Sequence, residues 1–160
     1  MLIRTASGDE MLNLWGYEDA DQAPPTARFF YRNITLGNAI FWTVEYEGKL
    51  IGELYAFLHI EEDGDFADGA DTAYLCAFRV KKEFRGRGLG SKMMEAALMD
   101  LKARGFRRAT IGVSEERNKN LYRRMGFVTE IKDCFFDPCA RDERMRPEPD
   151  AGFLLLSKDL

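Results

Sequence analysis

The stretch "FRVKKEFRGRGLGSKMM" (residues 78–94) places three glycines in one turn, between the end of one apolar segment and the start of another. The residues "TAYLCAFRV" (72–80) are almost continuously apolar, which is typical of a strand that is covered on both faces of a sheet. After the glycines, apolar residues recur at helical spacing over 88–104, and Gly105 follows as a stop signal. The chain is therefore predicted to run from a central strand through a tight turn into a helix.

The glycine turn also predicts an anion-binding loop. A sharp turn needs only one glycine, because glycine adopts positive φ angles without steric cost. Three glycines at alternate positions leave several backbone N–H groups accessible at the positive N-terminal end of the following helix. They are Gly86, Gly88 and Gly90, and three cationic residues accompany them: Arg85, Arg87 and Lys92. This combination favours a phosphorylated ligand over a purely structural turn.

Two familiar phosphate-binding loops do not fit this spacing. A Walker A loop ends in Gly-Lys-Ser or Gly-Lys-Thr, and "RGRGLGSK" contains neither. The dinucleotide fingerprint G-x-G-x-x-G, counted from Gly86, needs a glycine at position 91, where this chain has Ser91. The sequence therefore predicts neither a Mg-nucleotide site nor a dinucleotide site.

The rest of the chain contains no repeat or linker, so residues 1–160 are predicted to form a single domain. Asp9 is the expected cap of a first helix and Thr26 that of a second. Strands are expected at 2–7, 40–46, 50–60, 72–80, 108–114, 127–136 and 152–158, and helices at 9–17, 26–38, 88–104 and 117–125. The Pro- and charge-rich segment 137–150 is expected to be a surface loop. This order indicates an α+β fold with mixed strand pairing.

Composition excludes several classes of protein. The formal net charge of −4 gives the chain no long-range attraction to nucleic acid. Three cysteines and one histidine, without paired ligand spacing, predict neither a disulfide framework nor a metal site. The sequence shows no apolar region of a signal peptide and no apolar run as long as a membrane span. A cytoplasmic protein that binds neither nucleic acid nor membrane is expected.

Two motifs resemble the GNAT superfamily of acetyl-CoA-dependent N-acyltransferases. Arg85, Gly88 and Gly90 match its cofactor motif, which is Arg or Gln, two residues, Gly, one residue, and Gly or Ala after a central strand. The segment "RNKNLYRRMGF" (117–127) is similar to its Leu-Tyr-x-x-x-Gly-Phe signature. The resemblance is sharp over residues 74–127 and implies the GNAT fold. This fold is a twisted mixed sheet of six or seven strands with about four helices, splayed where the central strand meets the strand after the long helix.

The resemblance also implies which residues bind acetyl-CoA. In the family the loop amides bind the pyrophosphate of coenzyme A, and the backbone of the central strand pairs with the pantetheine arm. By position, the implied cofactor-binding residues are Phe78, Val80, Arg85, Gly86, Arg87, Gly88, Leu89, Gly90 and Ser91. Asn118 is assigned the same role because it lies one helical turn before Tyr122, although many members carry asparagine where this chain has Glu115.

Tyr122 is the implied general acid. A phenol is protonated at neutral pH and can donate its proton to a departing thiolate within hydrogen-bond reach. The general base stays open between Glu53, His59 and water, since both side chains lie on one face of the strand at 50–60. Cys76, in an apolar strand, is expected to be a small buried residue rather than an acetyl carrier.

These features predict an enzyme that transfers an acetyl group from acetyl-CoA to a primary amine of a small molecule or peptide, by direct attack in a ternary complex. A non-catalytic acyl-CoA-binding sensor of the same fold is the alternative. The acidic loop 61–71 carries six carboxylates, which favours a solvated hairpin tip or, less directly, attraction of a polyamine or basic peptide. Dimerisation is common in this fold, so a homodimer is a further expectation.

Overall fold

Residues 1–160 are all described by a computed structural model, in which seven strands form one mixed sheet with the order β1-β2-β3-β4-β5-β7-β6. The strands are β1 (Leu2–Ala6), β2 (Ala39–Tyr46), β3 (Lys49–Phe57), β4 (Thr72–Val80), β5 (Arg108–Val113), β6 (Thr129–Arg141) and β7 (Pro147–Asp159). The helices are α1 (Gly8–Trp15), α2 (Pro25–Thr35), α3 (Leu89–Ala103) and α4 (Glu116–Arg124), with 3₁₀ turns at Ala20–Gln22 and Lys82–Phe84. The predicted α+β class and the order of its elements are confirmed.

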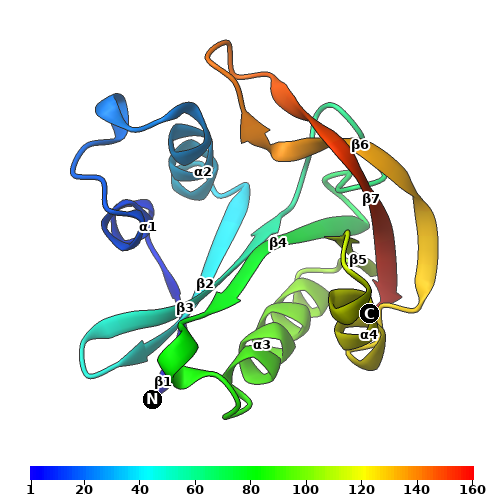
Figure 1. The fold of residues 1–160 in the computed structure, drawn as a ribbon, viewed down its shortest axis with the longest axis horizontal. Helices are drawn as coiled ribbons and strands as arrows, with labels where there is room; N and C mark the ends of the chain where they lie inside the picture. Colours follow the sequence, from blue (N-terminus) through cyan, green and yellow to red (C-terminus); the bar gives the residue numbers. More distant parts are fainter.

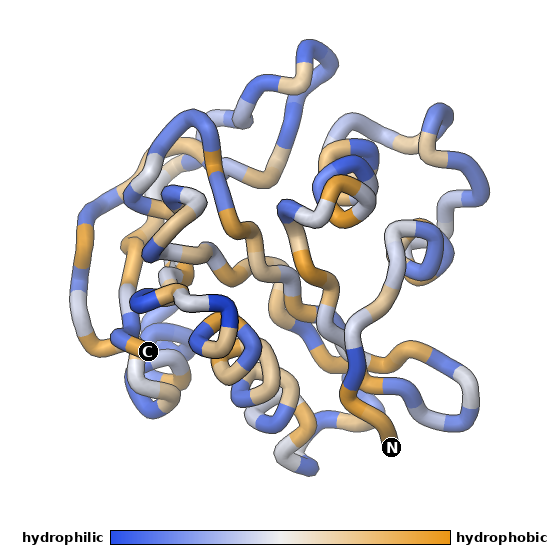
Figure 2. The backbone as a smooth tube through the Cα atoms, turned by 180° about the vertical axis from the view of Figure 1, so that it is seen from behind, coloured by the Kyte–Doolittle hydropathy of each residue, from blue (hydrophilic) through white to orange (hydrophobic).

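The helices lie on both faces of the sheet, α1 and α2 on one and α3 and α4 on the other (Figure 1). One hydrophobic core contains Met93 and Leu101 of α3, and a second contains Met11 of α1 and Phe30 of α2. The strands between them are largely hydrophobic, whereas the peripheral loops are mostly hydrophilic (Figure 2). Strand β4 is therefore covered on both faces, as its apolar run predicted. None of the helices is long and apolar enough to cross a membrane.

The first two helices begin differently from the prediction. The Ser7 side chain accepts the N–H of Glu10 at 3.1 Å, and the Glu10 carboxylate accepts the N–H of Ser7 at 3.1 Å. This capping box satisfies two N–H groups, so Asp9 is not the cap. Helix α2 begins with a proline, which needs no hydrogen-bond partner there, and has no side-chain cap. The Thr26 hydroxyl instead accepts the N–H of Arg141 at 3.1 Å.

Strands β4 and β5 separate after a short parallel pairing. Only the segment from Thr72 to Leu75 pairs with β5, whereas β4 stays paired with β3 as far as Val80. A bulge interrupts the pairing of β4 with β3 between Cys76 and Arg79, where Ala77 adopts a φ of +51°. The edge of β4 that faces β5 is consequently without a partner strand from Cys76 onwards, which is the predicted splay.

The prediction of a surface loop at 137–150 is wrong, because β6 and β7 both extend into it. The pairing continues through Phe136 with Pro149 and Asp137 with Glu148, interrupted by bulges. Pro147 and Pro149 are tolerated in β7 because β5 pairs with β7 only from Leu154 onwards, so these prolines cost no hydrogen bond to β5.

Arg141 fixes the end of β6 against the rest of the molecule. Its side chain is only 5 % exposed and forms a bidentate ion pair with Glu62 at 2.9 and 3.2 Å. It also donates to the carbonyl of Pro138 at 2.6 Å and lies 3.9 Å over the ring of Phe29. These contacts join β6, the acidic loop and α2, and such long-range contacts leave no local signal in the sequence.

Candidate active site

The glycine turn is shaped as an open cradle at the start of α3. Gly86 and Gly88 have φ angles of +79° and +75°, and a Cβ at either position would meet no atom within 4 Å. Gly88 is the N-cap of α3 and supplies no side-chain cap, so the first N–H groups of the helix stay available. At Gly90 a Cβ would lie 3.0 Å from the ring of Phe78, so the missing side chain lets the helix start approach β4. Donors without a cap at a helix N-terminus suit a phosphate.

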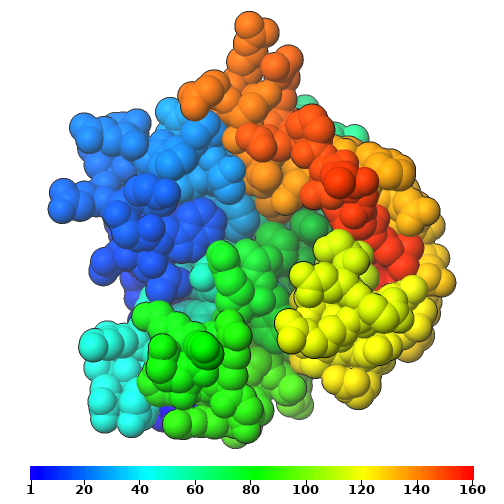
Figure 3. Space-filling view, viewed as in Figure 1, coloured from blue at the N-terminus to red at the C-terminus, as the bar shows by residue number.

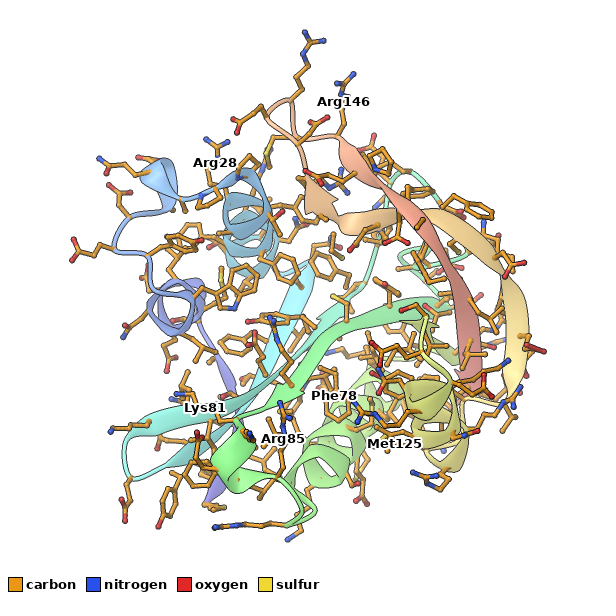
Figure 4. The ribbon with its side chains drawn as sticks, viewed as in Figure 1. Arg28, Phe78, Lys81, Arg85, Met125 and Arg146 are labelled. Atoms are coloured by element: carbon orange, nitrogen blue, oxygen red, sulfur yellow. The ribbon has the colours of Figure 1, made fainter.

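Two arginines of the turn are held beside this cradle. The Nε of Arg85 donates to the Val80 carbonyl at 2.8 Å, which ties the turn to the end of β4. The Arg87 guanidinium lies 5.4 Å from the ring centroid of Phe84. Both side chains are exposed, and Figure 4 shows Arg85 in the turn below Phe78 on β4. The structure thus brings backbone donors and cations together at one end of β4.

Two cavities adjoin at the splay. The inner cavity, of about 350 Å³, is lined by residues of α1, α2, β4, β5, α4 and β6, among them Tyr74, Phe78, Tyr122 and Asp137. The outer cavity, of about 600 Å³, is lined by residues of α1, α2, β3, β4 and the turn, among them Glu53, Val80, Lys81 and Arg85. Both are bordered by Trp15, Thr26 and Arg79. In Figure 3 this face is hollowed where the blue, green, yellow and orange segments meet.

Tyr122 lies on the wall of the inner cavity. Its ring centroid is 6.3 Å from that of Phe78 and 6.3 Å from that of Phe127, so α4 packs its tyrosine against β4. Burial raises the pKa of the Tyr122 hydroxyl above its ordinary value, since a phenolate is poorly solvated there. The hydroxyl is therefore protonated at neutral pH, as a proton donor must be.

The two predicted candidates for the base lie in different places. The Oε1 of Glu53 accepts the indole N–H of Trp15 and the hydroxyl of Tyr55, both at 2.9 Å, while Oε2 is 3.4 Å from the Nε of Arg79. The Glu53 side chain is 13 % exposed and borders the outer cavity. His59 borders a different hollow between α2 and the acidic loop, so the structure does not bring it to the site.

Asn118 and Cys76, which were also considered from the sequence, differ in their position relative to the two cavities. Asn118 is half-buried one helical turn before Tyr122, but it borders neither cavity. Cys76 is half-buried rather than buried, because β5 no longer pairs with β4 at this point. It forms part of the inner cavity wall, with its Sγ 3.7 Å from the Sγ of Cys139.

Five of the six carboxylates of the acidic loop form ion pairs or hydrogen bonds away from the two cavities. Glu62 pairs with Arg141, and Asp71 lies 3.8 Å from Arg107. Lys132 forms ion pairs with Asp63 and Asp65. Asp68 accepts three backbone N–H groups of the loop. No residue of the loop borders either cavity, which favours the hairpin-tip interpretation.

Several residues of the site were not predicted from the sequence. Trp15 and Thr26 reach both cavities from the N-terminal helices, and Arg79 reaches them from β4. Asp137 enters from β6, a segment that was expected to be a loop. The alternation of the β4 sequence could have indicated Arg79, but no local pattern marks Asp137. No group of three His, Cys, Asp or Glu side chains is arranged to hold a metal ion.

A splayed mixed sheet with an uncapped glycine turn and a half-buried tyrosine beside the split is the architecture of an acyl-CoA-dependent acyltransferase. The model of the acetyltransferase (GNAT) family matches residues 8–127, more than half of the chain, and the chain belongs to this family. It is accordingly an N-acetyltransferase with acetyl-CoA as co-substrate, and the sensor alternative has no support. No curated protein matches the chain.

Solved structures share the fold over nearly the whole chain. A GNAT family acetyltransferase from Elizabethkingia anophelis with acetyl-CoA bound is 16 % identical, with a TM-score of 0.63 over 99 % of this chain and 97 % of that one. A polyamine N-acetyltransferase from Drosophila melanogaster is 14 % identical, with a TM-score of 0.66 over 99 % of each chain. A ribosomal-protein-alanine N-acetyltransferase from Brucella melitensis is 16 % identical, with a TM-score of 0.66 over 100 % of each chain.

Proposed function

We propose that the protein acetylates a primary amine of a small molecule or peptide by direct attack on acetyl-CoA in a ternary complex. The observation that carries this proposal is the position of Tyr122 on a cavity that adjoins a second one. One cavity reaches the free edge of β4, and the other opens beside α1. Two substrates can therefore meet at the splay from different sides, as direct transfer requires.

The residues present fit coenzyme A. The guanidinium of Arg85 and the free N–H groups from Gly86 to Ser91 suit its pyrophosphate, and the unpaired edge of β4 at Phe78 and Val80 offers backbone partners for pantetheine. Acetyl-CoA supplies an acetyl group activated as a thioester. Asn118 remains a proposed cofactor contact only through its position on the same helix face as Tyr122.

The chemistry requires a neutral amine, a polarised thioester carbonyl and a proton for the leaving thiolate. The amine nitrogen bonds to the acetyl carbon, the carbon–sulfur bond breaks, and Tyr122 gives its phenolic proton to the sulfur. The excess proton of the amine leaves to a base or to water. Burial keeps Tyr122 protonated until the thiolate forms.

The decisive experiment is release of free coenzyme A thiol from acetyl-CoA with a panel of amines. The panel should contain peptides with free N-termini, polyamines, aminoglycosides and amino acids, because the structural neighbours include a polyamine and a ribosomal-protein-alanine N-acetyltransferase. Thiol release that depends on the amine, with one acetyl group added per thiol, supports the proposal. Binding of acetyl-CoA without thiol release for any amine would overturn it.

Two further expectations belong to this proposal. We propose a cytoplasmic location, which the three free cysteines suit because a reducing compartment keeps thiols unpaired. A homodimer also stays a prediction, and sedimentation of the purified chain at several concentrations would test it.

A further inference from the structure

Asp137 is the one negatively charged residue that borders the inner cavity. Of the residues lining this cavity, Asp137 is the only acidic one and Arg79 the only basic one. The rest are apolar or neutral, and they include Tyr122. A lone carboxylate facing a largely apolar cavity indicates a place for a cation, because charge is poorly solvated in such surroundings.

The carboxylate of Asp137 is held in place by its own strand. Its Oδ1 accepts the backbone N–H of Cys139 at 2.9 Å and that of Ala140 at 3.3 Å. The Oδ2 atom makes no hydrogen bond with the protein. The side chain is half-buried, so one oxygen fixes the group while the other is available to a ligand.

The other titratable groups around Asp137 leave it as the proton acceptor of this cavity. Burial raises the pKa of the Tyr74 hydroxyl and of the Cys139 thiol well above their ordinary values, so both stay neutral. Burial also keeps Tyr122 protonated. The titratable and charged side chains that face Asp137 or share the cavity with it are Tyr74, Cys76, Arg79, Tyr122, Cys139 and Arg141.

Glu53, the alternative carboxylate, is less suitable for this task. Oε1 already accepts two hydrogen bonds and Oε2 forms the ion pair with Arg79, so neither oxygen is free for a ligand. It also borders the outer cavity, away from Tyr122. Glu53 is therefore assigned to fixing Trp15 and Arg79 between the two cavities.

We propose that Asp137 binds the ammonium group of the acceptor in the inner cavity and removes its proton. This inference rests on the proposed function. The ammonium gives one proton to Oδ2, and the neutral nitrogen then bonds to the acetyl carbon as the carbon–sulfur bond breaks. The sulfur takes its proton from Tyr122, and the second proton of the nitrogen passes through solvent to the resulting phenolate. Asp137 then releases its proton to solvent. Asp137 is thus a catalytic residue that selects a small primary ammonium group.

The test replaces Asp137 by asparagine, with Asp133→Asn as a matched control. The Asp137→Asn variant keeps an oxygen for the N–H groups of Cys139 and Ala140 but loses the charge. Asp133 lies on the same strand, is exposed and borders neither cavity. With ethylamine as acceptor at neutral pH, kcat/KM is expected to fall about a hundredfold or more in Asp137→Asn and to stay unchanged in the control. The dissociation constant of acetyl-CoA, measured by calorimetry, should be unchanged in both.

Two readouts separate this role from a structural one. A weakly basic amine of the same skeleton, 2,2,2-trifluoroethylamine, is already neutral at pH 7. The loss of kcat/KM caused by Asp137→Asn should therefore be much smaller with this amine than with ethylamine. For ethylamine the deficit should shrink as pH rises towards the pKa of the amine. In the absence of acetyl-CoA, ethylamine should shift the NMR signals of the Cys139 and Ala140 amides in the wild type and in Asp133→Asn, but not in Asp137→Asn.

The results that would contradict the role of Asp137 differ from those that would contradict the proposed function. Equal kcat/KM in Asp137→Asn and wild type, or a deficit that is the same for both amines and at every pH, would overturn the role of Asp137 and leave the acetyltransferase proposal standing. Unshifted amide signals in the wild type at saturating amine would also overturn it. A wild type that binds acetyl-CoA but releases no thiol with any amine would instead overturn the proposed function, and with it this inference.

Discussion

The two sides of the splay are assembled in opposite ways. On the cofactor side, β4, the glycine turn and α3 follow one another within residues 72–103. On the acceptor side, Trp15, Thr26 and Asp137 come from three elements that are far apart in the chain. The first side depends on local backbone geometry, whereas the second depends on tertiary contacts that hold distant segments together. A substitution should therefore act on cofactor binding, on acceptor chemistry or on stability according to the side that it changes.

The largest effect is expected at Tyr122, where the two sides meet. Tyr122→Phe keeps the ring between Phe78 and Phe127 but removes the proton donor. We expect kcat to fall about a hundredfold, roughly 3 kcal/mol of transition-state stabilisation. The dissociation constant of acetyl-CoA, measured by calorimetry, should stay unchanged. An unaltered kcat would exclude Tyr122 as the general acid.

On the acceptor side, the largest effect on stability is expected at Arg141. Arg141→Met removes the ion pair with Glu62, the hydrogen bonds to the carbonyls of Pro138 and Met145, and the contact with the Phe29 ring. We expect a loss of about 3 kcal/mol in the free energy of unfolding, measured by urea denaturation.

Arg146→Met is the matched control for Arg141→Met. Arg146 lies in the β6–β7 turn, points outwards in Figure 4 and pairs with Asp142 in an exposed ion pair at 3.1 Å. We expect it to cost less than about 1 kcal/mol. Equal losses in the two variants would show that Arg141 does not hold β6 in place.

The same division explains what could be predicted from the sequence. The glycine turn was predictable because its glycines, its cationic residues and the spacing between them can all be read from one short segment. The course of β6 could not be predicted, because the strand is fixed in place by long-range contacts of Arg141 with Glu62 and Phe29. Asp137 was missed with the strand that carries it. His59 was predicted on the strand at 50–60, but β3 ends at Phe57 and His59 lies beyond it, beside α2 and the acidic loop.

A smaller effect, confined to the cofactor side, is expected at Gly88. An alanine at the φ of +75° is strained and costs about 1 kcal/mol of stability, and its Cβ would project into the cradle. Gly37→Ala is a matched control, since Gly37 has a φ of +80°, open surroundings and a position outside both cavities. Both variants should lose similar stability, but only Gly88→Ala should weaken acetyl-CoA binding, about tenfold or 1.4 kcal/mol. Equal affinities in calorimetry would contradict an anion cradle at the turn.

The smallest expected effect concerns the pH dependence of stability on the acceptor side. The ion pair with Arg141 holds the pKa of Glu62 below its ordinary value. A carboxyl with a lowered folded-state pKa adds stability above its unfolded pKa of about 4.3, and this stability is lost as pH falls through the folded-state pKa. Glu62 is one-third exposed, so solvent screening limits the contribution to about 1 kcal/mol.

Urea denaturation of wild type and Glu62→Gln across acidic and neutral pH measures this contribution. Near neutral pH the wild type should be the more stable of the two, and the two curves should converge below the folded-state pKa of Glu62. Glu61→Gln is the control, because Glu61 is an exposed neighbour in the same loop without an ion pair, and its curve should follow the wild type throughout. A difference between wild type and Glu62→Gln that stays constant at every pH would mean that the carboxylate charge of Glu62 does not stabilise β6. The strand would then be held by the remaining side-chain contacts of Arg141, which are the carbonyls of Pro138 and Met145 and the Phe29 ring.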